Sequence, residues 1–158
     1  MARRVLNKRR LALGAPPAAL PSGSDAWIFA SLAARGSTRL RDLIARADML
    51  NRAIPTGAEI RSAIRYLHGR GLVVARGQTI SLTAIGRKVY ANGLGRRGGL
   101  FKVTGNMEKA LRSKRFPHKA VRARSSVASP SDAAVHRAYV AYDAWFNSLK
   151  LSSRRRHT

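Results

Sequence analysis

Residues 56–83, TGAEIRSAIRYLHGRGLVVARGQTISLT, contain the start and end of one helix, a short β-hairpin and the start of another helix. Thr56 and Glu59 have the T-x-x-E spacing of a capping box, in which each side chain accepts a hydrogen bond from the other residue's backbone N–H. The apolar residues that follow have the i, i+3, i+4, i+7 spacing of a buried helical face: Ile60, Ala63, Ile64 and Leu67. The stretch therefore predicts a helix over residues 56–69.

Turn residues divide the rest of this stretch. Gly69 and Gly71 end the helix, because glycine tolerates a left-handed backbone. Two segments rich in β-branched residues, LVVA and TISL, flank Arg76-Gly77-Gln78, which predicts a hairpin with a tight turn. Thr83 caps a last helix that closes at Gly93.

The preceding residues predict two further helices. Ser24 caps the first, which directs Trp27, Ile28 and Leu32 inward and stops at Gly36. Ser37 or Thr38 opens the second, whose core positions are Leu40, Leu43, Ile44 and Ala47. The expected order is helix, helix, helix, hairpin, helix, a mainly α fold with a small β-hairpin.

This order resembles the winged helix-turn-helix superfamily over residues 25–93. The family's glycine with Leu-Val after the third helix corresponds to Gly71, Leu72 and Val73, and its LT-x-x-G step after the wing corresponds to Leu82, Thr83 and Gly86. The segment ADMLNRAIPTGAEIRSAI also resembles small uncharacterised bacterial winged-helix proteins. The resemblance implies a third helix that enters the DNA major groove and a wing, residues 72–82, that touches the backbone.

The charge of the chain favours a polyanionic partner. It has 31 basic and 7 acidic residues, a formal net charge of +24, and a folded surface gains nothing by repelling itself this strongly. Most basic residues are arginine, whose guanidinium binds phosphates and guanine edges in two-point geometry. A GC-rich genome would explain arginine over lysine, but not the scarcity of acids.

The outward face of helix 56–69 is predicted to meet nucleic acid. With the apolar residues inward, small residues and two arginines one turn apart face outward. An ordinary solvated face is the alternative, although such a face usually mixes Glu with Lys. The candidate DNA-binding residues are Thr56, Ala58, Arg61, Ser62, Arg65, Arg39, Arg41, Arg76 and Gln78.

Outside the winged-helix domain of residues 25–93, four segments are expected: a basic flexible arm (1–24), a basic Gly-rich linker (94–128), an amphipathic aromatic helix (129–151) and a basic tail (152–158). Phe101 and Phe116 lie among the linker's charges, a composition suited to phosphate tracking and base stacking. A disordered linker whose aromatics pack on the domain is the alternative. The tail residues predicted to contact nucleic acid are Arg96, Arg97, Lys102, Arg112, Lys114 and Arg115.

The helix at 129–151, for which Ser129 and Ser131 are cap candidates, has a face that must be buried. This aromatic face consists of Val135, Tyr139, Tyr142, Phe146 and Leu149. Two interpretations stay open: it packs on the first helix of the domain, or it pairs with the same helix of a second chain to form a homodimer.

Catalytic and metal sites are not expected. The chain has no cysteine, its four histidines have no ligand spacing, and its acids suggest no acid/base pair. GLGRRGG lacks the ending of a phosphate-binding loop. We therefore expect no enzyme, no cofactor and no metal. Pro16, Pro17 and Pro21 interrupt the apolar stretch after the basic N-terminus, so we expect a cytoplasmic protein, in the nucleoid, with no membrane partner.

The sequence favours a winged-helix DNA-binding transcriptional regulator or nucleoid-associated protein, with duplex DNA as the favoured partner. An RNA- or ribosome-associated basic protein is the first alternative. The second is a protein-interaction module that binds an acidic partner.

Overall fold

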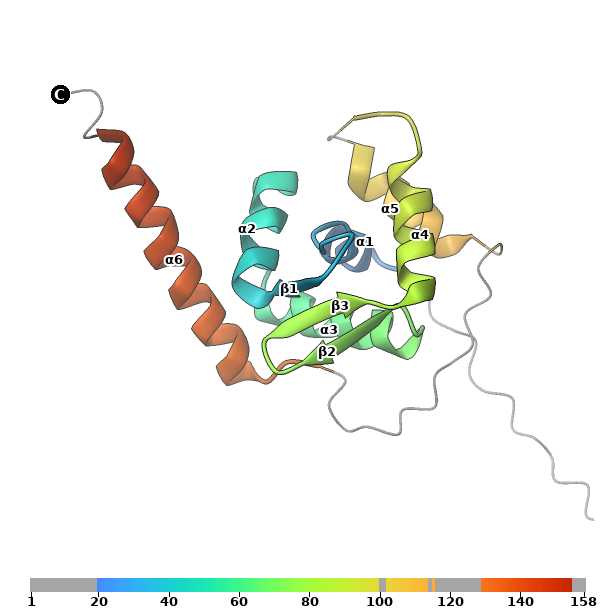
Figure 1. The fold of residues 1–158 in the computed structure, drawn as a ribbon, viewed down its shortest axis with the longest axis horizontal. Helices are drawn as coiled ribbons and strands as arrows, with labels where there is room; N and C mark the ends of the chain where they lie inside the picture. Colours follow the sequence, from blue (N-terminus) through green and yellow to red (C-terminus); the bar gives the residue numbers. More distant parts are fainter. Residues whose placement is uncertain (1–19, 100–101, 114, 116–128, 155–158) are drawn as a thin grey trace, which may run out of the picture.

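The computed structural model describes residues 20–99, 102–113, 115 and 129–154. These residues form a mainly helical fold with a small three-stranded antiparallel sheet (Figure 1). The elements are α1 (Gly23–Ala30), β1 (Ser37–Arg39), α2 (Leu40–Asn51), α3 (Gly57–Gly69), β2 (Val73–Arg76), β3 (Thr79–Leu82), α4 (Ala84–Leu94), α5 (Val103–Arg112) and α6 (Asp132–Arg154).

The start of α3 confirms the predicted capping box. The Glu59 backbone N–H donates to Thr56 Oγ1 at 3.2 Å, and the Thr56 N–H donates to the Glu59 carboxylate at 2.8 Å. The hydrogen bond from the Thr56 backbone lowers the pKa of Glu59. The helix ends at Gly69, and Gly71 follows with φ 67°, which explains why a glycine is needed there.

The predicted hairpin is present and is joined by a strand that the sequence analysis did not predict. Gly77, in the turn between β2 and β3, has φ 57°. The strand order is β1-β3-β2. Ser37 and Thr38, expected to open the second helix, instead lie in β1, and α2 begins at Leu40. The buried Thr38 side chain accepts the Ala33 N–H at 2.8 Å, and β1 pairs with the distant strand β3, a long-range pairing that local pattern does not reveal.

The first helix is also corrected. Its cap is Ser22, which forms a capping box with Asp25, and it ends at Ala30 rather than at Gly36. Ser24, the expected cap, lies inside the helix, and its hydroxyl donates to Glu59 Oε1 at 2.9 Å. The sequence offered two serines before the same apolar run, and the one three residues before an acid forms the cap.

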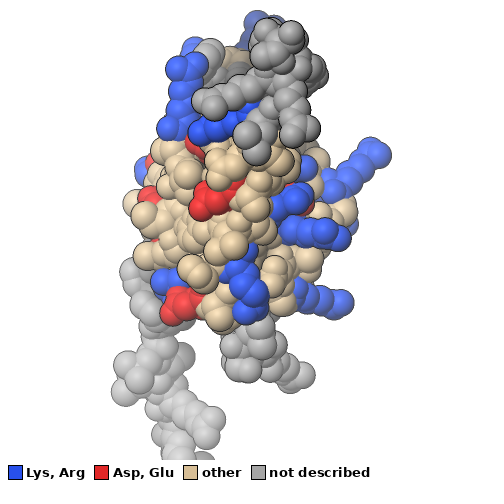
Figure 2. All heavy atoms as spheres, turned by 90° about the vertical axis from the view of Figure 1, so that its left-hand side faces the viewer, with Lys and Arg blue, Asp and Glu red and all other residues tan. Residues whose placement is uncertain are grey.

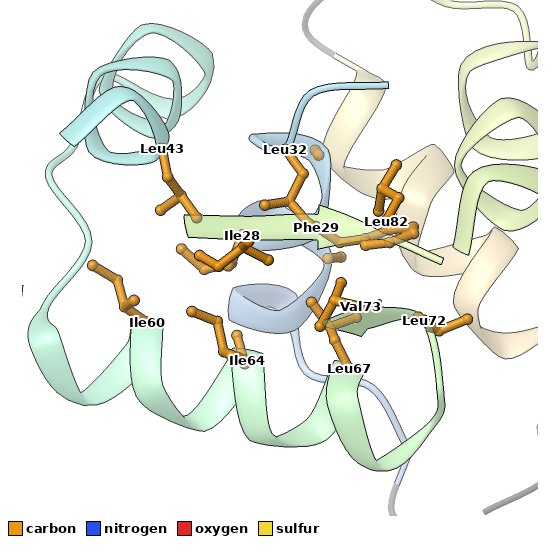
Figure 3. Packing of buried hydrophobic residues seen from close by; sticks show 14 of the residues in the cluster. Ile28, Phe29, Leu32, Leu43, Ile60, Ile64, Leu67, Leu72, Val73 and Leu82 are labelled. Atoms are coloured by element: carbon orange, nitrogen blue, oxygen red, sulfur yellow. The ribbon is translucent and has the colours of Figure 1, made fainter. Parts of the chain in front are cut away.

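A single hydrophobic core joins all the helices and the sheet. Ile28 and Phe29 of α1 and Leu32, just after that helix, belong to this core, and α1 packs against α3 and α5 (Figure 3). Figure 3 also shows Ile60, Ile64 and Leu67 of α3 pointing into this core. Their burial confirms the face predicted from the spacing.

The segment expected to be a linker contains a packed helix. In α5, Met107, Ala110 and Leu111 are buried in the core, and the helix lies against α4 and α1. A side chain on Gly93 would meet Met107 Sδ at 2.3 Å, so the close contact between α4 and α5 requires a glycine at that position. The linker prediction is therefore wrong for residues 103–112, because their apolar residues are spaced to pack although charges surround them.

Within the described residues, none of the helices combines the length and the hydropathy that crossing a membrane requires.

Candidate nucleic-acid interface

The outward face of α3 consists of small residues and one arginine. Ala58, Ser62 and Arg65 are exposed, opposite the buried Ile60 and Ile64. Arg65 forms no ion pair with another described residue. The single acid of this helix, Glu59, is engaged in the cap and in the bond from Ser24. Among the described residues, Arg65 is therefore an exposed cation without an ion-pair partner, and the other exposed side chains of this face are short.

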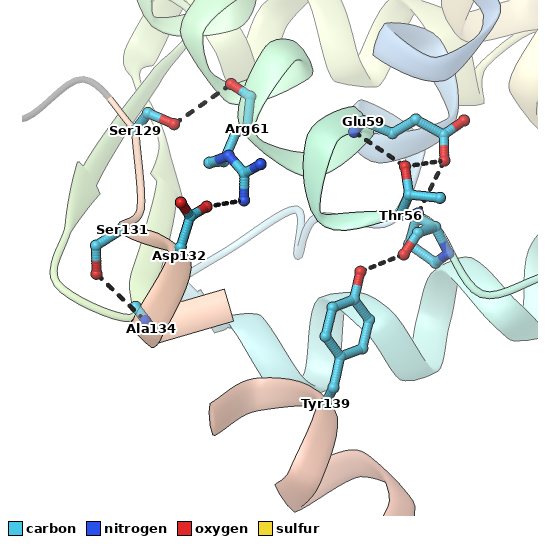
Figure 4. A network of polar contacts seen from close by, with 9 residues as sticks. Thr56, Glu59, Arg61, Ser129, Ser131, Asp132, Ala134 and Tyr139 are labelled. Atoms are coloured by element: carbon cyan, nitrogen blue, oxygen red, sulfur yellow. Dashed lines mark hydrogen bonds and ion pairs between the residues drawn. The ribbon is translucent and has the colours of Figure 1, made fainter. Parts of the chain in front are cut away.

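Arg61 does not share that face as predicted. Its guanidinium forms an ion pair with Asp132, the first residue of α6, and its backbone carbonyl accepts the Ser129 hydroxyl at 3.4 Å (Figure 4). Its side chain is only 29% exposed, whereas that of Asp132 is 85% exposed. The physical reason is helical phase: Arg61 lies on the flank of α3 that faces α6, not on the outward side.

The contact between α3 and α6 is close as well as polar. A side chain on Gly57 would lie 3.2 Å from Arg61 Nη1 and 3.3 Å from Val135 Cγ1. Tyr139 adds a hydrogen bond from its hydroxyl to the carbonyl of Pro55, just before α3 (Figure 4). The start of α6 is thus held against the first turns of α3. The sequence placed Asp132 in the cap or first turn of a helix, where it lies, but did not predict its contact with α3.

The sheet brings two of the predicted arginines into one row. Thr79 of β3 pairs with Arg39 of β1 on one side and with Arg76 of β2 on the other. Directly paired residues point to the same face of a sheet, and Ile80 and Leu82 point to the core, so this row faces outward. Arg39 and Arg76 are exposed, and two strand spacings separate their backbones by about 10 Å.

A hollow lies on the same face of the sheet beside Arg76. Its volume is about 260 Å³, and it is lined by Val74, Arg76, Thr79 and Ser81. Gln78, another predicted contact, is exposed in the turn, and its carbonyl accepts the Leu40 N–H at 2.9 Å. The hairpin tip is therefore attached to the start of α2.

Two of the other predicted contacts already have partners. Arg41 forms an ion pair with the neighbouring Asp42 at 2.6 Å. Thr56 is occupied by the capping box. Both side chains remain at the surface, but neither presents an unshared donor to a ligand as directly as Arg65 or Arg76.

The predicted tail contacts lie near α4 and α5 and are exposed where the structure describes them. Arg96 donates to Asn92 Oδ1 at 3.4 Å, and Arg112 forms an ion pair with Glu108 at 2.6 Å. The other exposed members are Arg97, Lys102 and Arg115. Lys114, Phe101 and Phe116 lie outside the described residues.

The aromatic face of α6 is divided between core and surface. Val135 and Tyr142 are buried, and the Tyr142 hydroxyl donates to Asp48 Oδ2 of α2 at 2.7 Å. Burial and this bond raise the pKa of Tyr142 to about 12. Phe146 and Leu149 are 37% and 46% exposed. The helix packs on α2 and α3 rather than on the first helix, which corrects the first interpretation of this face.

Among the described residues, no group of three or more His, Cys, Asp or Glu side chains is arranged to hold a metal ion. Comparison of the chain with models of protein families, with curated proteins and with solved structures finds no match.

Proposed function

We propose that this chain is a winged-helix DNA-binding protein that acts as a transcriptional regulator or a nucleoid-associated protein in the cytoplasm. In this proposal α3 enters the major groove, and the β2–β3 hairpin lies on the neighbouring backbone. The observation that carries the proposal is the outward face of α3, where Arg65 stands among Ala58 and Ser62 with no free acid beside it.

The shape of that face suits a groove. The major groove is about 12 Å wide and admits an α-helix, and small side chains let the helix backbone approach the base edges. Arginine is the side chain that most often makes a specific base contact, through two hydrogen bonds to guanine. Arg65 has the reach for this role because its neighbours on the face are short.

The row of Arg39, Thr79 and Arg76 suits the phosphate backbone. Two guanidinium groups on one face of a rigid sheet can contact phosphates without first ordering a loop. Such contacts position a protein on the duplex and supply salt-dependent affinity, whereas base contacts supply specificity. The net charge of +24 adds long-range attraction to any polyanion.

The element order supports the same proposal. A helix, a short strand, two helices and a hairpin, with sheet order β1-β3-β2, resemble the arrangement of winged-helix domains. The fold does not by itself assign a function, so the proposal depends on the two arginine-bearing surfaces.

The test is selection of bound sequences from random duplex DNA, followed by binding measurements with the variant Arg65→Ala. We expect a selected sequence motif and a loss of about 1–3 kcal/mol on it, with little change on unrelated DNA. Arg35→Ala is the matched control, because Arg35 is an exposed arginine in the loop between α1 and β1.

Two results would contradict the proposal. If Arg65→Ala and Arg35→Ala weaken binding equally on every duplex, α3 does not read DNA. If the chain prefers structured RNA and Arg65→Ala changes nothing, the RNA- or ribosome-associated alternative is favoured. Recovery of an acidic protein without nucleic acid after nuclease treatment would favour the protein-interaction alternative.

A further inference from the structure

A groove between α2 and α6 remains outside the core. Its volume is about 380 Å³, and it is lined by Ala45, Arg46, Asp48, Met49, Tyr142, Trp145, Phe146 and Leu149. The large apolar residues at its rim are substantially exposed: Met49 is 64%, Trp145 39% and Leu149 46% exposed. Aromatic and aliphatic side chains gathered in this way indicate a surface that binds a partner.

The groove is shaped by the part of α6 that leaves the domain. The first half of α6 is anchored by Val135, Ala138 and Tyr142, which are buried, whereas the second half runs outward past α2 (Figure 1). Trp145 and Leu149 are one turn apart on this second half; both line the groove and are partly exposed, and this α6 rim of the groove is called the Trp145–Leu149 ridge. The same surface therefore has both a ridge and a groove, which is what a self-complementary contact about a twofold axis requires.

The charge of this surface differs from that of the rest of the chain. Residues 40–51 and 132–150, which form α2 and most of α6, contain four of the 31 basic residues but four of the seven acidic ones. The basic residues are Arg41, Arg46, Arg137 and Lys150, and the acidic ones are Asp42, Asp48, Asp132 and Asp143. These two stretches are thus neutral overall in a chain of net charge +24, and the remaining basic residue of α6, Arg154, lies at its last position.

Figure 2 shows the molecule from the α6 side. Basic side chains lie mainly towards the edges of this view, whereas its centre consists mostly of uncharged residues and a few acidic ones. A neutral face is where a strongly basic protein can meet another basic protein without strong repulsion. An acidic protein or a nucleic acid would gain more on the arginine-rich surfaces. A helix that lies on an anionic membrane usually has several Lys and Arg along its polar face, whereas residues 132–150 have only Arg137 and Lys150, balanced by Asp132 and Asp143.

From the groove, the ridge and the local neutrality, we propose that this surface binds a second copy of the chain. The Trp145–Leu149 ridge of one copy lies in the groove between α2 and α6 of the other, and the same contact is repeated by symmetry. Of the aromatic face of α6, the second half supplies the ridge, because Val135 and Tyr142 are already buried within one chain. This inference goes beyond nucleic-acid binding and does not depend on it.

The test is the solution mass of the full chain by light scattering and sedimentation, after nuclease treatment and in high salt, over a micromolar concentration series. We expect twice the chain mass of 17.2 kDa. Leu149→Lys should give the mass of one chain or raise the dissociation constant at least tenfold. Leu94→Lys is the matched control, since Leu94 is 49% exposed at the end of α4 and gains the same charge.

A second measurement does not depend on a disruptive variant. The chain has no cysteine, so Leu149→Cys introduces a single thiol beside the proposed contact, and Leu94→Cys introduces one elsewhere. Mild oxidation should produce a covalent dimer with the first and not with the second at equal concentration.

A wild-type mass of one chain throughout the series would overturn the proposal, as would equal effects of the Leu149 and Leu94 substitutions. Flotation of a monomeric chain with anionic lipid vesicles, lost in Leu149→Lys, would assign the surface to a membrane instead. DNA binding by a monomer would overturn the dimer and leave the proposed function intact.

Discussion

Asp132 at the first position of α6 forms an ion pair with Arg61 in the second turn of α3, so a carboxylate from the end of the chain engages a cation beside the proposed recognition face (Figure 4). The contact joins the helix proposed to read DNA to the helix proposed to mediate dimerisation. Because Asp132 is 85% exposed, the pair contributes little to stability. Its consequence is electrostatic: it neutralises one positive charge on the flank beside the proposed recognition face.

Removing this carboxylate is expected to strengthen nucleic-acid binding. Asp132→Asn leaves the Arg61 guanidinium without its counter-charge, so the affinity for duplex DNA at low salt should rise several-fold, and the salt dependence should steepen by about one counterion. Asp143→Asn is the control, because it adds the same charge on the other part of α6. Equal gains from both variants would show that only net charge matters and that Arg61 takes no part.

The row of Arg39 and Arg76 is expected to contact phosphates rather than bases. Each substitution to alanine should weaken binding to specific and unrelated duplexes alike and reduce the slope of log K against log salt by about 1. With six to ten phosphate contacts in total, wild-type affinity should fall roughly 10³- to 10⁵-fold between 50 and 200 mM salt. Binding titrations at several salt concentrations measure both quantities, and a binding constant insensitive to salt would contradict them.

The hydrogen bond between Tyr142 and Asp48 is expected to stabilise the attachment of α6 to α2. Tyr142→Phe removes it and should lower the free energy of unfolding by about 1 kcal/mol or somewhat more, since the acceptor is a carboxylate. Tyr66→Phe is the matched control: its hydroxyl is buried and has no hydrogen-bond partner among the described residues, so its removal should be neutral or stabilising. Urea denaturation measures both, and a larger loss for Tyr66→Phe would contradict this assignment.

The capping box of α3 is expected to make stability depend on pH. Hydrogen bonds from Thr56 lower the pKa of Glu59 below its ordinary value of 4.5. A carboxyl whose pKa is lower in the folded state contributes stability above its unfolded pKa and loses it as the pH falls through the folded value. Stability should therefore decrease on acidification below about pH 4.5, and Glu59→Gln should reduce that decrease.

Denaturant unfolding at a series of pH values from neutral to acidic measures this dependence. Glu108→Gln is the comparison, because Glu108 pairs with Arg112 at the exposed end of α5 and no cap depends on it. If the Glu59 and Glu108 variants have the same pH profile, the cap does not cause the effect.

Local sequence predicted the elements that are governed by short-range rules. The α3 capping box, the buried face of Ile60 and Ile64, the glycine turn at Gly77 and the Thr83 cap of α4 are all present. Each depends on residues a few positions apart, so spacing and residue type suffice to predict it. The exposure of Arg65 on α3 follows from the same helical periodicity.

Local sequence pattern did not predict the contacts between segments that are far apart in the chain. Strand β1 has three residues and forms only because β3 pairs with it, and that pairing places Arg39 beside Arg76. Helix α5 is apolar on one side, but its burial depends on the glycine at position 93. Arg61 is a further example. Helical periodicity predicted its approximate direction on α3, but its partner Asp132 lies 71 residues further along the chain and could not be predicted.

The sequence by itself determined the charge, the order of most elements and an α3 face with an exposed arginine, because composition and periodicity are local properties. Only the tertiary structure decided that α6 packs on α2, that Asp132 engages Arg61 and that Trp145 and Leu149 stay at the surface. The physical reason is that the sequence of an amphipathic helix shows which face must be buried, whereas the shape and charge of the whole fold decide which element buries it.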